Sequence, residues 1–440
     1  MSAMTGQEAI EYITSKKTVE TAPGVHRIRT LMEALGNPQR EYPCIHVAGT
    51  NGKGSACAMA ESVLRAAGYR TGLDTSPHLL RFNERIQING VPVSDQRLAE
   101  AVGRVRDAAE AMEEGPNWSE IITAVTLVVF ALEKVDVAVL EVGLGGEFDP
   151  TNVIDTPAAA MIMNIGYDHM DLLGGTLEEI ASAKAGIIKA GGDVVIYRGT
   201  PGVEAVFEQA AARCGARLHK ADFDSIRPVS ETIDGQIFDA CGYEGLALPL
   251  AGPHQQRNAA VVITAMDVLR AKGWHITEDD IRGGLAHVVW PARFEVISHD
   301  PVFILDGGHN PQCLDAADDA LRRLLPGKRV VFLVGMLRDK DVEEMVERLR
   351  TVSSEYVTIT PLSDRAMEAE DLTKVIRAKG GNAVTGGEIA RGIELAREKA
   401  GKDGAVCCIG SLYLAGAVRS IMLGQDSLPS SGEASVHSAP

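Results

Sequence analysis

The sequence contains no apolar run long enough to cross a lipid bilayer, which takes about 20 consecutive apolar residues. Residues 1–20 are polar and lack the apolar core of a secretory signal. We therefore expect a protein that does not span a membrane and carries no secretory leader.

Positive charge is scarce. The chain has 43 Lys and Arg against 60 Asp and Glu, which gives a formal net charge of −17. Nucleic-acid binding needs clustered Lys and Arg, and anionic membrane surfaces attract basic segments. The charge balance therefore excludes nucleic acid and membranes as expected partners. An anionic substrate would need a local cationic site.

Paired cysteines are also missing. The seven cysteines show no C-x-x-C spacing, and Cys407 and Cys408 are adjacent within an apolar run. An odd number of cysteines in hydrophobic segments is typical of buried free thiols in a reducing compartment. We therefore expect a cytoplasmic protein.

With 440 residues, the chain is too long for one ordinary core, and 45% hydrophobic against 23% charged residues is typical of soluble globular proteins. Helical and strand-like patterns alternate after residue 42. Residues 135–142 form a continuous apolar run, as in strands buried on both faces of a parallel sheet. With further strands expected at 69–75, 158–165 and 193–197, the pattern predicts an α/β fold with a doubly wound parallel sheet.

A second α/β alternation begins after Trp290 and Pro291, with strands expected at residues 302–305, 330–334, 356–360 and 406–409. It predicts a smaller Rossmann-like domain, although no G-x-G-x-x-G is present. Short strand-like pieces at 222–250 indicate a small antiparallel addition. We expect three parts: residues 1–295, residues 296–424, and a Ser/Pro-rich tail at 425–440 that is disordered.

The first domain is organised around Gly49-x-x-Gly52-Lys53-x-Ser55, which follows an apolar run and precedes a helix. A glycine loop at a helix N-terminus is a site for anions, because backbone N–H groups and the positive helix end face the ligand. Lys53 adds a positive charge, and the Ser55 hydroxyl could reach a magnesium ion. The spacing is shorter than in the usual P-loop, so a surface turn with incidental glycines remains an alternative.

Polar residues follow other predicted strands: Ser76, Glu141 and His169. Ligands of open α/β sheets bind at the carboxyl ends of the strands, so these residues could converge with the glycine loop. Magnesium prefers oxygen ligands, which makes a metal site one interpretation. A strand-end carboxylate and a hydrogen-bonded turn histidine are the alternative.

Other polar residues have simple structural explanations. Lys184 lies on a helix that opens with a capping box, and composition alone predicts a solvated lysine. In residues 306–311, Asn310 suits a helix N-cap and Pro311 the first helical turn, which leaves His309 as a polar residue without an assigned task. Arg293 is consistent with a surface arginine.

Taken together, the motifs resemble those of folylpolyglutamate synthases and dihydrofolate synthases, which belong to the Mur ligase superfamily. The resemblance begins with residues 46–55, His-Val-Ala-Gly-Thr-Asn-Gly-Lys-Gly-Ser. Further matching blocks follow in the family's order at residues 75–79, 82–86, 140–146, 149–152, 164–169, 184–189, 254–259, 290–293, 306–311, 339–341 and 410–414.

The resemblance implies specific roles. ATP would bind the loop residues Asn51, Gly52, Lys53, Gly54 and Ser55 together with Asn258, Arg293 and Asp306. Magnesium would be held by Ser76, Glu141 and His169, and catalysis would also involve His309 and a carbamylated Lys184. The substrate side would comprise Glu120, Phe148, Asp149 and Pro150 for the pterin and Ser411 for the incoming glutamate.

The implied function is an ATP-dependent ligase that adds L-glutamate to a folate carboxylate through an acyl phosphate, acting as a monomer; dihydropteroate is a further possible acceptor. Two departures concern the pterin side, where Glu147 replaces the usual arginine and residues 116–120 keep only the glutamate of the family block. They leave open a Mur-type ligase that acts on a non-folate carboxylate. A non-catalytic nucleotide-binding regulator is the rival from another class.

Overall fold

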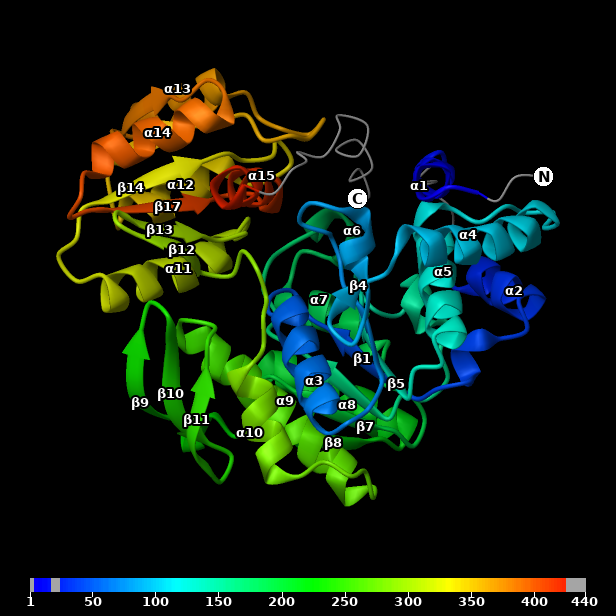
Figure 1. Cartoon of the computed structure of the whole chain (residues 1–440). Helices are drawn as coiled ribbons and strands as arrows, with labels where there is room; N and C mark the ends of the chain where they lie inside the picture. The colour runs from blue at the N-terminus through cyan, green and yellow to red at the C-terminus, as the bar shows by residue number, and fades with distance from the viewer. Residues whose placement is uncertain (1–3, 17–23, 425–440) are drawn as a thin grey trace.

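The computed structural model describes residues 4–16 and 24–424, and the tail predicted to be disordered, 425–440, lies outside them. Figure 1 shows two α/β bodies with a small separate sheet beside them. No helix within the described residues is long and apolar enough to cross a membrane.

The first body is built on an eight-stranded sheet of order β4-β3-β2-β5-β1-β6-β7-β8. Its centre is β1 (Cys44–Ala48), which pairs in parallel with β5 (Val137–Glu141) and β6 (Ala159–Ile162). The flanking strands are β2 (Thr71–Asp74), β3 (Ile86–Ile88), β4 (Val91–Pro92), β7 (Asp193–Ile196) and β8 (Arg217–Lys220). Among the described strands of this sheet, only the pairings β2–β3 and β3–β4 at one edge are antiparallel, so the predicted doubly wound parallel sheet is confirmed.

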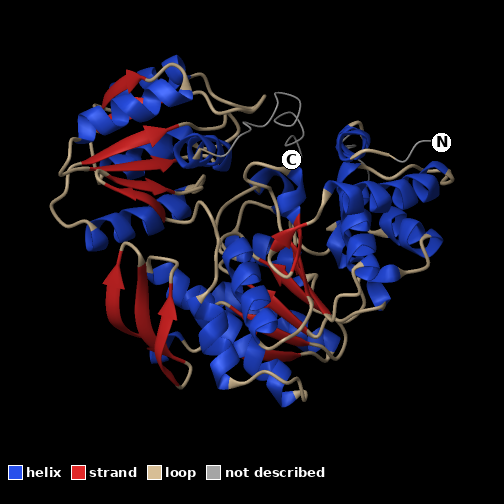
Figure 2. Ribbon diagram, in the orientation of Figure 1, coloured by secondary structure: helices blue, strands red, loops and turns tan. Residues whose placement is uncertain are grey.

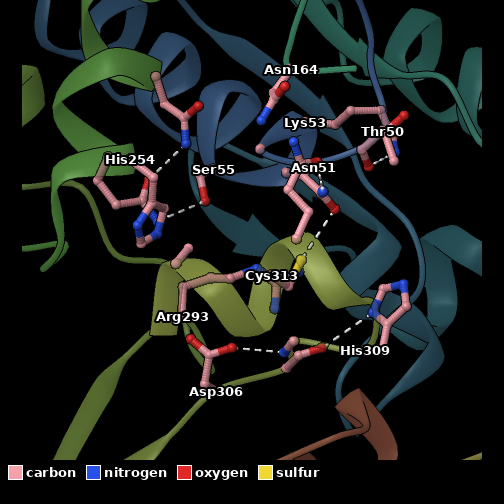
Figure 3. A pocket seen from close by; sticks show the side chains of 18 of the residues that line it. Thr50, Asn51, Lys53, Ser55, Asn164, His254, Arg293, Asp306, His309 and Cys313 are labelled. Atoms are coloured by element: carbon pink, nitrogen blue, oxygen red, sulfur yellow. Dashed lines mark hydrogen bonds between the residues drawn. The ribbon is translucent and has the colours of Figure 1, made fainter. Parts of the chain in front are cut away.

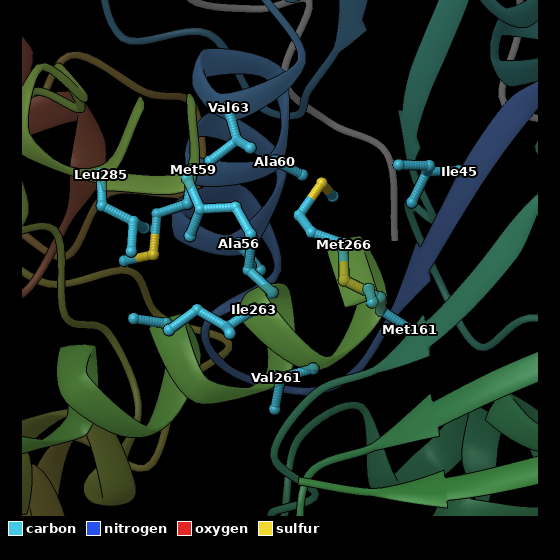
Figure 4. Close-up of a cluster of buried hydrophobic side chains, with 14 of the residues drawn as sticks. Ile45, Ala56, Met59, Ala60, Val63, Met161, Val261, Ile263, Met266 and Leu285 are labelled. Atoms are coloured by element: carbon cyan, nitrogen blue, oxygen red, sulfur yellow. The ribbon is translucent and has the colours of Figure 1, made fainter. Parts of the chain in front are cut away.

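Helices cover both faces of this sheet. One face is covered by α3 (Lys53–Ala66), α9 (Pro253–Ala271) and α10 (Glu278–Ala286), whose Met and Ile side chains interlock with those of the central strands (Figure 4). Helix α10 crosses α3 so closely that a Cβ on Gly284 would lie 2.4 Å from the Cα of Val63. The other face carries α1 (Gly6–Thr14), α2 (His26–Ala34), α4 (Asp95–Glu110), α5 (Trp118–Leu132), α7 (Leu177–Ala185) and α8 (Pro201–Cys214).

The expected antiparallel addition is also present. Strands β9 (Arg227–Thr232), β10 (Gly235–Ala240) and β11 (Tyr243–Leu248) form a three-stranded antiparallel sheet. Its inner face joins the core around α9 through Phe238 and Leu246. The tip of the β9–β10 hairpin reaches the second body, where Ile233 packs against its core and His299 hydrogen-bonds Asp234 at 2.9 Å.

The second body contains a six-stranded sheet of order β12-β13-β17-β14-β15-β16 (Figure 2). Its strands are β12 (Glu295–His299), β13 (Val302–Leu305), β14 (Val330–Val334), β15 (Glu355–Thr358), β16 (Asn382–Thr385) and β17 (Ala405–Ile409). One face is covered by α11 (Pro311–Leu324), α12 (Val342–Arg350) and α13 (Ala369–Ala378), and the other by α14 (Ile389–Ala400) and α15 (Leu412–Leu423). Short elements are η1 (Pro38–Arg40), η2 (Phe82–Arg85), η3 (Pro150–Val153), η4 (Phe223–Ser225) and α6 (Met170–Leu173).

An ion cluster around one buried carboxylate joins strands and helix at the edge of the first sheet farthest from β4. The Asp193 carboxylate, at the start of β7, receives hydrogen bonds from Arg217 at 2.6 and 2.8 Å, and lies 2.8 Å from His219 and 2.7 Å from Lys272. The hydrogen bond from Arg217, the largest cause, lowers the pKa of Asp193 well below its usual range.

We predict that Asp193→Asn destabilises the fold by about 1–3 kcal/mol and lowers Tm by several degrees, because charged hydrogen bonds to a buried carboxylate are lost. Since the folded pKa is depressed, the contribution is present at neutral pH and disappears only as the pH falls through that depressed value. Both pH 5 and pH 7 lie above the usual and the depressed pKa, so thermal unfolding of the two proteins should give the same loss of stability at both pH values. Asp155→Asn is the control, because Asp155 pairs with Arg40 at an exposed site, and an equal loss there would contradict the prediction.

Candidate active site

The glycine loop lies between β1 and α3, at the centre of the first sheet. Gly52 has φ 85° and is the N-cap of α3, whose first residue is Lys53. The loop is held down by the Asn164 carbonyl, which accepts the N–H groups of Thr50 at 2.8 Å and Asn51 at 3.3 Å. The N–H groups of the first turn of α3 thus open onto the carboxyl edge of the sheet.

This loop forms one wall of a cavity between the two bodies (Figure 3). The first body contributes the predicted residues Asn51, Gly52, Lys53, Gly54, Ser55, Ser76, Glu141 and Asn258. The second body and the segment leading into it contribute the predicted residues Arg293, Asp306 and His309. The structure therefore brings together residues that lie up to 258 positions apart, as between Asn51 and His309.

Glu141 and Ser76 stand together on this wall. Glu141 is buried at the end of β5, and its Oε2 accepts the backbone N–H of Ser76 at 3.0 Å. Burial raises the pKa of Glu141, while the positive charge of Lys53 opposes that shift. The carboxylate thus faces the same space as the Lys53 ammonium group.

His169 lies beside this cavity rather than among the residues that line it. It follows β6 in the left-handed conformation, φ 51°, and burial lowers its pKa to about 4. Its neighbour Asp168 links the two bodies: Lys340 contacts the carboxylate at 2.9 Å, His309 at 3.7 Å and Asn310 at 3.4 Å. Within the described residues, no group of three His, Cys, Asp or Glu side chains could hold a metal by itself.

Lys184 is not a solvated lysine. It lies near the end of α7 and is buried. Burial, assisted by the positive charge of Lys53, lowers the pKa of Lys184 to about 7. A large fraction of this amine is therefore neutral near pH 7.

Asp306 and Arg293 are joined through backbone contacts. Asp306 Oδ1 accepts the N–H of Gly308 at 2.7 Å, and Oδ2 accepts the N–H of Phe294 at 2.9 Å. Burial raises the pKa of Asp306, and Arg293 is the largest opposing influence. Asp306 thus fixes the loop after β13 against the segment that carries Arg293.

The predicted substrate residues do not line this cavity. Helix α5 begins at Trp118, where Asn117 and Glu120 form a capping box. The Glu120 carboxylate is also 3.0 Å from the buried Arg27. Asp149 turns inward to hydrogen-bond the Leu144 N–H at 2.9 Å and Thr151.

Two of the three remaining residues predicted for the substrate side lie at the start of a helix. Pro150 opens η3, and the buried Ser411 is the N-cap of α15. Phe148 is 52% exposed, and Tyr167, Met170 and Leu172 nearby in the α6 region are exposed as well.

Sequence reasoning missed several residues of the cavity wall. Gln312 and Cys313, in the first turn of α11, hydrogen-bond Asn51 at 2.6 and 3.1 Å. Gln255 connects Ser55 at 3.3 Å with Asn258 at 3.0 Å. Gln312 had only a positional signal, because it follows Pro311 at a helix start. Gln255 lies in the matching block 254–259, less than one turn before Asn258, but was given no role.

Two protein-family models match the chain. The Mur ligase middle domain matches residues 47–266, and the model described as "Mur ligase, glutamate ligase domain" matches residues 292–412. The first range covers the body with the glycine loop, and the second covers the body with Asp306. By fold and domain order, the chain is a Mur ligase.

Curated relatives match nearly the whole chain. It is 38% identical to folylpolyglutamate synthase of Lacticaseibacillus casei, over 95% of this chain and 98% of the relative. It is 34% identical to dihydrofolate synthase/folylpolyglutamate synthase of Bacillus subtilis, over 94% of this chain and 98% of the relative. A solved complex of folylpolyglutamate synthase with AMPPCP and folate superposes with a TM-score of 0.83 at 36% identity, covering 96% of this chain and 100% of the other. The chain belongs to the folylpolyglutamate synthase and dihydrofolate synthase family of ATP-dependent ligases.

We predict that Gly52→Ala weakens binding of a non-hydrolysable ATP analogue by about tenfold or more, a loss of about 1.4 kcal/mol. A Cβ at Gly52 would lie 2.7 Å from Asn258 Oδ1, so the loop or Asn258 must move. Gly36→Ala is the matched control, because Gly36 has a similar φ of 82° but no atom within 4 Å of the added Cβ. Calorimetric titration of both variants measures the difference, and equal affinities would contradict the prediction.

Proposed function

We propose that this enzyme binds ATP in the cavity between its two bodies and ligates L-glutamate to the carboxylate of a folate. The observation that carries the proposal is that the α3 N-terminus, Lys53 and Arg293 line one cavity in a chain of net charge −17. The solved relative in complex with AMPPCP and folate supports the same substrate class.

The reaction divides into two steps. An oxygen of the acceptor carboxylate attacks the γ-phosphorus of ATP, and the bond to the β–γ bridging oxygen breaks, giving an acyl phosphate and ADP. The amine of L-glutamate then attacks the acyl carbon, loses a proton and expels phosphate, which leaves an amide. Proteins accelerate such steps chiefly by positioning the reactants and stabilising charge.

Residues of both bodies would stabilise charge and exclude water in this reaction. Lys53 and the N–H groups of α3 neutralise phosphate charge from one side of the cavity, and Arg293 does so from the other. The contact of Asn51 with Gln312 at 2.6 Å and the ion pair of Asp168 with Lys340 close the gap between the bodies. Closure excludes water, which would otherwise hydrolyse the acyl phosphate.

Magnesium fits the donor set on the cavity wall. Glu141 supplies a buried carboxylate, and Ser76 supplies a hydroxyl beside it, both oxygen donors of the kind that Mg²⁺ prefers. We propose His169 as the third protein ligand. Because the protein alone offers few ligands, nucleotide phosphates would complete the coordination shell of the ion. The ion would neutralise charge on the phosphates of ATP.

Lys184 is proposed to be carbamylated. The neutral amine attacks CO₂ and loses a proton, which converts a cationic side chain into an anionic oxygen donor. Burial favours this reaction because it keeps a large fraction of Lys184 in the neutral form near pH 7.

We propose that the enzyme acts as a monomer, because residues of both bodies of the same chain line the cavity. All seven cysteines are free, which supports the cytoplasm as its location.

Glu147 bears on the identity of the acceptor, because it places a negative charge in the exposed loop next to Phe148. We predict glutamate-dependent ADP release with tetrahydrofolate, and test dihydropteroate and unrelated carboxylates in the same assay. ADP release with a non-folate carboxylate only would favour the Mur-type alternative. Absence of ADP release with every one of these acceptors would favour a non-catalytic nucleotide-binding regulator. Lys53→Ala is measured in the same assay. We expect its rate of ADP release to fall by about 10²–10³, because one preorganised charge is removed.

For Lys184, we predict that activity in bicarbonate-depleted buffer is low and returns when bicarbonate is added. At fixed dissolved CO₂, the carbamylated fraction should rise as the pH increases through about 7, because only the neutral amine reacts. A ¹³C carbamate signal from labelled bicarbonate measures it directly. The signal should vanish in Lys184→Arg and persist in Lys189→Arg; its persistence in Lys184→Arg would refute the assignment.

A further inference from the structure

Arg293 lies between two residues with unusual backbone conformations. Ala292 has φ 55° and Phe294 has φ 49°, and both are buried. Left-handed conformations are unfavourable for residues with a Cβ, and they persist only where surrounding contacts hold them. The kink lies between α10 and β12 and directs the Arg293 side chain into the nucleotide cavity (Figure 3).

The carbonyl side of the kink is fixed by the loop after β13. The Ala292 carbonyl accepts the Gly307 N–H and the Arg293 Nη1–H, both at 2.9 Å. Gly307 can approach because it lacks a Cβ, which would lie 2.6 Å from Arg293 Nη1.

The N–H groups of the two left-handed residues go to two carboxylates. The Phe294 N–H donates to Asp306 Oδ2 at 2.9 Å, and Asp306 belongs to the cavity wall. The Ala292 N–H donates to Glu295 Oε2, also at 2.9 Å. Glu295 is not among the residues that line the cavity, so it cannot act by touching the nucleotide directly.

Glu295 is itself held by Arg419 of α15. Arg419 Nε lies 3.0 Å from Oε1 and 3.1 Å from Oε2, and the two side chains are only 18% and 22% exposed. The carboxylate therefore has a fixed orientation in which Oε2 points at the Ala292 N–H. Without it, this N–H would lose its acceptor in a buried segment.

We propose that Glu295, oriented by Arg419, is a positioning residue for the nucleotide: by accepting the Ala292 N–H, it maintains the kink that directs Arg293 into the cavity. The inference rests on the proposed function, since it assumes that Arg293 binds the ATP phosphates. The competing interpretation is an ion pair that only stabilises the second body.

Three variants separate these interpretations by their KM for ATP and their Tm. Glu295→Ala removes the hydrogen-bond acceptor of the Ala292 N–H. We expect KM for ATP to rise about tenfold with little change in kcat, because ground state and transition state lose the same binding energy. Glu295→Gln keeps a carbonyl oxygen for the Ala292 N–H, so KM should stay within about threefold of the parent enzyme. The double variant Glu295→Arg with Arg419→Glu retains opposite charges but offers no acceptor at residue 295, so KM should remain high even where Tm recovers.

A matched control is Glu355→Ala in the same body. Glu355 pairs with Lys399 at 3.0 Å, and these side chains are 20% and 23% exposed, close to the values of Glu295 and Arg419. This variant should lose stability without raising KM for ATP. The proposal is overturned if Glu295→Ala and Glu295→Gln share one KM, or if the charge-swapped pair restores both Tm and KM.

Arg293→Ala distinguishes failure of this inference from failure of the proposed function. We expect it to raise KM for ATP at least as much as Glu295→Ala does. If Arg293→Ala leaves KM unchanged, the nucleotide assignment of Arg293 itself is wrong. If Arg293→Ala raises KM and Glu295→Ala does not, only the positioning role of Glu295 is refuted.

Discussion

The electrostatic requirement of holding a polyphosphate organises this molecule, because the chain as a whole repels anions with its net charge of −17. The parallel sheet meets that requirement at one place, the carboxyl edge of β1, where a glycine turn exposes the N–H groups of α3 and Lys53 follows at once. Arg293 brings a second positive charge from the segment between the bodies. The buried Glu141 also lines this cavity, so the cavity combines local positive charge with a carboxylate.

The second body completes the site rather than merely covering it. Asn51 of the glycine loop contacts Asn310, Gln312 and Cys313 at the start of α11. Asp168, after β6, contacts Lys340 in the loop before α12. Because these contacts cross from one body to the other beside the glycine loop, a change in the orientation of the bodies would alter the cavity directly.

Much of this arrangement could be predicted from the sequence, because strand ends and helix starts leave local signals. The glycine loop, Ser76 and Glu141 were placed at strand ends, and the structure gathers them on one wall. Helix α8 also carries local signals at both ends, since Thr200 is its N-cap and Gly215 its C-cap.

Other features depend on contacts between distant residues and have no local signal. Glu120 was assigned to the substrate side, yet its carboxylate caps α5 and pairs with Arg27, 93 positions earlier. Lys184 carries no mark of burial in its own helix, which opens with an ordinary capping box. The reduced pKa of Lys184 arises from the sheet and loops packed around it and from Lys53, far away in the sequence.

Carboxylates in and around this site serve backbone geometry as much as chemistry. Both oxygens of Asp306 accept backbone N–H groups, one oxygen of Glu141 accepts the Ser76 N–H, and Asp149 holds the turn at Leu144. A carboxylate that accepts buried N–H groups fixes a loop more firmly than a neutral acceptor, since charge-assisted hydrogen bonds are stronger. Residue types that resemble ligands in the sequence can therefore act by fixing the loops that present the ligands. Because a carboxylate can either face the ligand or fix a loop, motif residues lie both on the cavity wall and behind it.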